Sequence, residues 1–133
     1  MRFLSIYKTA ETNVPPTAES MARMGKLIED MTKAGTLLAT EGCLPSALGA
    51  RVRLSGGKVT VTDGPFAETK EVVGGFALLE ARSKEEAIEM ARTFLAVAGD
   101  GECEIRQIFT QPEAASGGCV EGNMGLADQF ARG

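Results

Sequence analysis

Histidine does not occur in this sequence of 133 residues. Its absence excludes an imidazole general base, a Ser-His or Cys-His nucleophile pair, and a histidine ligand for a metal ion. Only carboxylates, amines, hydroxyls and thiols are left for acid–base or nucleophilic chemistry. The carboxylates lack the spacing of a calcium loop and the glycines lack the pattern of a phosphate-binding loop, so we expect no metal and no cofactor.

Cysteines are few, and long apolar runs are missing. Cys43, Cys103 and Cys119 are widely spaced and form no Cys-x-x-Cys pair, which is typical of reduced thiols in a cytoplasmic protein. Without histidine, a nucleophilic Cys43 would need a helix N-terminus or a nearby cation, so inert apolar filling is the favoured interpretation. Lys8 interrupts the first apolar stretch, and no run approaches the roughly 18 residues of a membrane helix. We therefore expect neither a signal peptide nor a membrane span.

Positive charge is also scarce, because 14 Lys and Arg stand against 18 Asp and Glu and give a net charge of -4. Such a chain has no long-range attraction for nucleic acid or for an anionic membrane, and we predict neither as a partner. The 44% hydrophobic and 24% charged content is typical of a soluble globular protein. The length predicts one compact core.

Hydrophobic periodicity predicts an alternation of strands and helices. Apolar residues recur at steps of three and four from Met21 onward, after a helix cap at Thr17, and this helix ends at Gly35. A second helix begins with a capping box at Ser83 and ends near Gly99. The predicted strands are residues 2–8, 36–43, 51–54, 58–62, 73–80 and 102–109.

This order gives two β-α-β units of similar length around an inserted hairpin. It predicts a ferredoxin-like α+β domain over residues 1–110, with an antiparallel sheet and both helices on one face. Residues 111–133 are rich in Gly and Ala and are predicted to form a loosely held tail. The uncovered sheet face would expose a large apolar patch, so we expect a second copy to cover it in a homodimer.

The inserted hairpin has the clearest turn signal in the chain. Gly56 and Gly57 supply the positive φ angles that a tight hairpin turn requires. Alternation places the apolar side chains Val52, Leu54, Val59 and Val61 on one face and the basic side chains Arg51, Arg53 and Lys58 on the other. A solvated face is the favoured interpretation of the basic strip.

The segment after the hairpin carries an unusual motif, Asp63-Gly64-Pro65-Phe66-Ala67-Glu68-Thr69-Lys70-Glu71, followed by Gly74-Gly75-Phe76. It resembles the signature of the DGPF proteins of the YCII-related group, and the resemblance covers roughly residues 2–109. The resemblance implies a dimeric α+β barrel of ferredoxin-like subunits, in a family whose members mostly have no assigned reaction. Gln107 stands where such proteins usually have proline. The histidine–aspartate pair proposed in some relatives has no counterpart here.

The motif has a structural and a functional interpretation. In the structural one, Asp63 begins a turn by accepting backbone N–H bonds two residues on, Gly64 adopts unusual dihedral angles, and Phe66 anchors the loop. In the functional one, Asp63, Glu68 and Lys70 are catalytic acid–base groups beside a cleft. An extended chain would place Glu68 and Lys70 on one face. The candidate ligand-binding residues around that cleft are Tyr7, Arg51, Arg53 and Phe66.

Three functions are consistent with these features. The first is a homodimer with a small-molecule pocket near the DGPF loop and cofactor-independent acid–base chemistry. The second is a non-catalytic interaction or regulatory module, since the resemblance implies a link to sigma factors of the extracytoplasmic-function type. The third is a dimeric scaffold whose motif only shapes the fold. A buried pocket with a carboxylate of shifted pKa favours the first, exposed apolar or charged surface beyond the dimer interface favours the second, and the absence of both favours the third.

Overall fold

A computed structural model of the chain describes residues 1–12, 14–66 and 68–109. The tail predicted for residues 111–133, with Cys119, lies outside the described residues. The chain divides into two compact units, one formed by residues 1–51 and 62–108 and one that contains the hairpin residues 52–61. No helix in the described part of the chain is long and apolar enough to cross a membrane.

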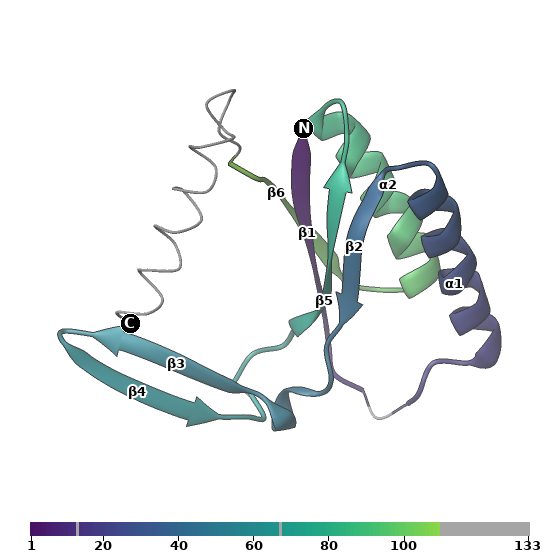
Figure 1. The fold of residues 1–133 in the computed structure, drawn as a ribbon. Coiled ribbons are helices and arrows are strands. Elements are labelled where there is room, and N and C mark those ends of the chain that lie inside the picture. Colours follow the sequence, from purple (N-terminus) through teal and green to yellow (C-terminus); the bar gives the residue numbers. More distant parts are fainter. Residues whose placement is uncertain (13, 67, 110–133) are drawn as a thin grey trace. The chain divides into compact units, whose positions relative to one another are not determined.

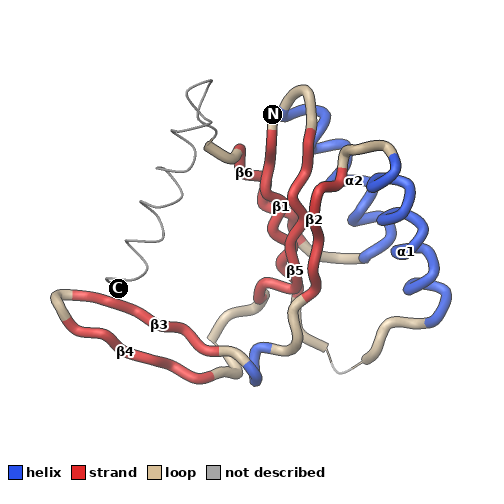
Figure 2. The backbone as a smooth tube through the Cα atoms, viewed as in Figure 1, coloured by secondary structure: helices blue, strands red, loops and turns tan. Residues whose placement is uncertain are grey.

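The larger unit is built on a four-stranded sheet with the order β2-β5-β1-β6. All three strand pairs are antiparallel, and both helices lie on one side of the sheet (Figure 1). Figure 2 shows the same arrangement as a layer of strands beside a layer of helices. This is the ferredoxin-like α+β fold that the order of elements predicts. The sheet strands are β1 (Arg2–Thr9), β2 (Leu37–Gly42), β5 (Val72–Glu80) and β6 (Glu102–Gln107), and the helices are α1 (Ala18–Lys33) and α2 (Lys84–Ala98).

Both helices begin at the predicted caps. The Thr17 side chain accepts a hydrogen bond from the Ser20 N–H at 3.0 Å, and the Ser83 hydroxyl accepts one from the Glu86 N–H at 3.2 Å. The Glu86 carboxylate, however, accepts from the Arg82 backbone N–H instead of returning to Ser83, so the capping box is only half formed. Local side-chain chemistry is enough to set both helix starts.

The core lies between the sheet and the helices, and the alternation of β1 decides which side chains enter it. Phe3, 1% exposed, and Ser5 face the helices, whereas Leu4 and Ile6 project from the opposite face. Helix α1 has no fully buried residue, and Met21, at the start of its predicted apolar stripe, is exposed. The core cluster comprises Phe3, Leu37, Leu79, Ala81 and Ala87.

The hairpin forms a separate two-stranded sheet from β3 (Ala50–Ser55) and β4 (Lys58–Asp63). Its turn has positive φ at Gly56 (57°) and Gly57 (80°), as predicted. A short 3₁₀ helix, η1 (Ser46–Leu48), precedes β3 and was not predicted. The last strand, β6, ends at Gln107 and not at the predicted residue 109. The four apolar side chains of the hairpin are exposed: Val52 70%, Leu54 58%, Val59 48% and Val61 62%.

Candidate functional site

The predicted site residues lie in several places in the structure. Arg51, Phe66 and Glu68 come together beside the DGPF loop. Tyr7 instead lines a cavity between the sheet and the helices, and Arg53 belongs to the hairpin unit. The two other candidates, Asp63 and Lys70, are exposed and form no side-chain hydrogen bond or ion pair with another described residue.

The residues around the DGPF loop form an ion pair stacked on an aromatic ring. The Arg51 Nη1 donates to Glu68 Oε1, and the Arg51 guanidinium carbon lies 4.0 Å from the centre of the Phe66 ring. The hydrogen bond from Arg51 is the main cause that lowers the pKa of Glu68. Glu68 is therefore an ionised anchor, and lowering its pKa weakens it as a general base. The basic strip is exposed, as expected, and within it Arg51 is also paired.

A second set of contacts beside this loop involves two residues that the sequence analysis missed, Glu11 and Ser46. One oxygen of the Glu11 carboxylate accepts from the Ser46 N–H at 2.6 Å, and the other accepts from the Ser46 hydroxyl at 2.5 Å. The Ser46 oxygen in turn accepts from the Phe66 N–H at 3.2 Å. The hydrogen bonds from Ser46, side chain first, lower the pKa of Glu11. We call these three residues the loop latch, because they join three distant segments at the DGPF loop.

The DGPF turn itself differs from its predicted chemistry. Asp63 accepts no bond from the residue two positions on, because that residue is Pro65 and has no N–H. Gly64 does not have a positive φ; a Cβ there would overlap the Ser46 carbonyl oxygen, so close approach requires the glycine. The Thr69 N–H donates to the Phe66 carbonyl at 3.2 Å and closes a turn, so the condition of an extended chain, under which Glu68 and Lys70 would share a face, is not met.

An open surface hollow adjoins this loop. It includes Arg51 and Phe66 from the predicted binding residues, but its lining contains none of the three predicted catalytic side chains. Cys43 also lines it and is exposed, so this cysteine is not the buried filling that we expected. The hollow is a surface depression and does not gather the candidate residues into one site.

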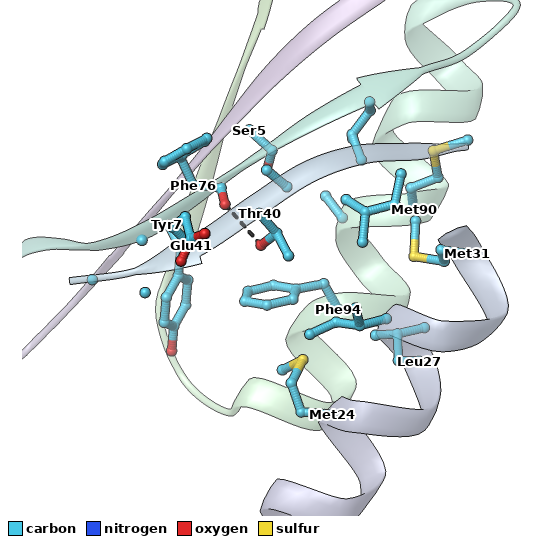
Figure 3. A pocket seen from close by; sticks show the side chains of 18 residues that line it. Ser5, Tyr7, Met24, Leu27, Met31, Thr40, Glu41, Phe76, Met90 and Phe94 are labelled. Atoms are coloured by element: carbon cyan, nitrogen blue, oxygen red, sulfur yellow. Dashed lines mark hydrogen bonds between the residues drawn. The ribbon is translucent and has the colours of Figure 1, made fainter. Parts of the chain in front are cut away.

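A cavity that is partly open to solvent lies between the sheet and the helices and has a volume of about 370 Å³; we call it the interior cavity. Figure 3 shows methionine side chains and Phe94 around it, with Tyr7 at one end. The Tyr7 and Phe94 rings meet edge to face, with centres 5.1 Å apart. Helix α1 has no fully buried residue because its inward side chains border this cavity. The helix side chains that line it are Met24, Leu27, Ile28, Met31, Met90, Ala91 and Phe94.

The polar side chains of the cavity are few, and the hydroxyls of two of them are already engaged. The Tyr7 hydroxyl donates to the Asp100 carbonyl at 3.1 Å, and the Thr40 hydroxyl donates to the Phe76 carbonyl at 2.9 Å (Figure 3 draws the second bond). No lysine or arginine is among the described residues that line it, and Glu41 is their single charged member. The register pairs Glu41 with Phe76, whose neighbour Ala77 packs on the core, so the Glu41 side chain belongs to the opposite face of the sheet. The cavity is thus predominantly apolar.

The fold and the cavity define a class, the ferredoxin-like α+β proteins with a pocket between the sheet and its helices. The sequence model of the YCII-related domain matches residues 1–111, and the chain belongs to that family. The chain is also similar to an uncharacterized protein of Rhizobium meliloti (strain 1021), with 39% identity over 77 residues. The similar stretch covers 57% of this chain and 62% of that protein.

Proposed function

We propose that this YCII-related protein binds a small organic molecule in the interior cavity of each subunit of a homodimer. The observation that carries the proposal is the cavity of about 370 Å³ beneath the helices. Ligand pockets have volumes of about 300–1,000 Å³ and apolar walls with a few polar groups. The sequence predicts a pocket near the DGPF loop, whereas the ligand is proposed here to lie between the sheet and the helices.

The DGPF motif has a structural role in this proposal. Glu68 is held by Arg51, and the latch bonds of Ser46 hold Phe66 in place. No hydrogen bond or ion pair joins Asp63, Glu68 and Lys70 to one another in the described part of the chain. Acid–base catalysis by these three residues is a weaker hypothesis, because general catalysis needs groups that converge on one substrate atom.

The homodimer rests on the sheet face that turns away from the helices. In the larger unit, the register places Leu4 beside Leu78 and Ile6 beside Phe76 on this face. Phe76 remains 38% exposed, and neither helix covers this side of the sheet. Charges of both signs border the apolar centre, so the face is complementary to a second copy of itself. These bordering side chains are Lys8, Glu41, Glu104 and Arg106.

The exposed apolar face of the hairpin is relevant to the interaction-module alternative, because it could bind another protein. The hairpin exposes four apolar side chains on one face, and an isolated two-stranded hairpin is marginally stable in water. In a homodimer a second copy of the chain is always present, so we assign the covering surface to the second copy and not to a sigma factor. A double substitution, Leu54→Ser with Val59→Thr, should weaken the dimer; an unchanged dimer constant would argue for another partner.

A thermal-shift screen of small organic molecules tests the ligand proposal. A molecule at about 100 times its dissociation constant stabilises the folded state by about 2.7 kcal/mol, which raises Tm on the order of 10 °C in a chain of this length. Ala77→Leu adds three carbons at a cavity wall and should abolish the shift. Ala96→Leu makes the same change at an exposed position of α2 and should leave it intact. Equal shifts in both variants would place the ligand outside the cavity.

A further inference from the structure

The lining of the interior cavity also limits the kind of molecule that it can hold. We propose that the ligand is an uncharged aromatic molecule that carries one hydrogen-bond donor, such as a phenol or an indole. This inference rests on the proposed function, because it takes the interior cavity as the ligand site. Three properties of the wall carry it: the absence of a counter-ion, the nature of the apolar groups, and the state of the hydroxyls.

The described wall offers no partner for a charged group. It contains no lysine or arginine, and the Glu41 side chain belongs to the opposite face of the sheet. Lys8 also projects from that opposite face, where its Nζ donates to Glu104 at 2.8 Å. A charged group held against these walls would lose part of its hydration and gain no opposite charge, which is a net cost. Uncharged molecules are therefore strongly favoured.

The apolar groups of the wall suit an aromatic ring. Met24, Met31 and Met90 place three thioethers around the cavity, as Figure 3 shows. Methionine sulfur makes favourable contacts with ring edges, and the flexible side chain adapts to the shape of the ligand. The rings of Tyr7 and Phe94 already meet edge to face and add two aromatic surfaces. At about 370 Å³ the cavity is near the lower end of ligand-pocket volumes, which favours a molecule of one or two rings.

The hydroxyl oxygens of Tyr7 and Thr40 can each accept a hydrogen bond from a ligand. Each of these two hydroxyls already donates its hydrogen to a backbone carbonyl, of Asp100 and Phe76 respectively. Their oxygens keep lone pairs, so they can accept a bond from the ligand without breaking an existing one. The Ser5 hydroxyl also lines the cavity (Figure 3) and can either donate or accept. Two of the three hydroxyls on the wall can therefore only accept, which favours a ligand with an O–H or N–H group.

A set of four naphthalenes tests the inference with the shape held nearly constant. The compounds are 2-naphthol, 2-methoxynaphthalene, 2-naphthoate and 2-naphthylmethylammonium. The sequence has no tryptophan and one tyrosine, so naphthalene fluorescence can be followed directly during titration. We expect 2-naphthol to bind best, the methoxy compound about fivefold more weakly for one lost hydrogen bond, and both ions at least about 100-fold more weakly.

Methyl NMR of the methionines locates the bound compound. Signals of Met24, Met31 and Met90 should shift with 2-naphthol, whereas the exposed Met21 should not. The Ala77→Leu variant should lose binding and the Ala96→Leu variant should keep it.

The outcomes separate the inference from the proposed function. If either ion binds as tightly as 2-naphthol and shifts the three methionine signals, the ligand class is overturned and the cavity remains the site. A methoxy compound that binds as tightly as 2-naphthol overturns the donor requirement. If no naphthalene binds while another class of compound gives a cavity-dependent thermal shift, the aromatic class is wrong. If no compound of any class gives that shift, the proposed function fails as well.

Discussion

Replacing Gly64 by alanine tests whether the DGPF motif is a packing device. The added methyl group would overlap the carbonyl oxygen of Ser46, which belongs to the backbone and cannot rotate away. Either the loop or η1 must move, which threatens the 2.9 Å bond from the Gly64 N–H to the Gly49 carbonyl. Overpacking costs about 1–3 kcal/mol and a lost hydrogen bond about 1 kcal/mol, so we expect Gly64→Ala to lower the free energy of unfolding by about 2–4 kcal/mol.

Gly25→Ala is the matched control. Gly25 lies in α1, and a Cβ at this position meets no atom within 4 Å. Alanine forms helix better than glycine, so this variant should be more stable than the wild type by about 0.5–1 kcal/mol. Replacing glycine by alanine is therefore expected to lower the free energy of unfolding at position 64 and to raise it at position 25.

Urea denaturation followed by far-ultraviolet circular dichroism measures both effects. The midpoint should fall for Gly64→Ala and rise for Gly25→Ala, with unchanged m values if both variants unfold in two states. If Gly64→Ala lowers the free energy of unfolding by less than about 0.5 kcal/mol, the motif is not a packing device, because a tight backbone approach cannot accept a methyl group at so small a cost.

Three further predictions concern the latch, the dimer and the thiols. Folding lowers the pKa of Glu11, so the bonds of its carboxylate stabilise the protein above the ordinary carboxyl pKa and are lost as pH falls through the lowered value. The wild type should therefore lose its stability advantage over Glu11→Gln between about pH 5 and pH 3. A difference in the free energy of unfolding that stays constant over this range would contradict the latch. Phe76→Glu should convert the proposed dimer to monomer in light scattering, whereas Met21→Glu, on an exposed helix position, should not. Iodoacetamide at pH 8 should label Cys43 before Cys103 by peptide mass, because burial raises the Cys103 pKa; the reverse order would contradict this.

The elements that the sequence predicts depend on short-range chemistry. The Thr17 and Ser83 hydroxyls cap their own helices three residues on, and the paired glycines of the hairpin turn act within a few residues. The order of these elements restricts a chain of this size to few topologies, which is why the ferredoxin-like arrangement follows from the pattern. The DGPF resemblance likewise indicates the YCII-related family, which the match over residues 1–111 confirms.

The predictions that failed are those that needed a distant neighbour. Asp63 and Gly64 were interpreted as parts of a self-contained turn, but the glycine is required by Ser46, on a different segment. Glu11 and Ser46 are 35 residues apart, and no local pattern connects a carboxylate to a serine at that distance. Arg51 is exposed as predicted, but no local pattern indicates its pairing with Glu68, 17 residues on.

The cavity shows most clearly what only the tertiary structure decides. The alternation of β1 puts Tyr7 on the same face as Phe3 and Ser5, but alternation alone does not show that this face borders an unfilled space. A stripe of Met24, Ile28 and Met31 is typical of a packed helix, and its periodicity is the same whether a core or a hollow lies beneath it. Local sequence patterns determine the elements and their inward faces, whereas the space left between those faces depends on how all the side chains of the sheet and both helices pack together.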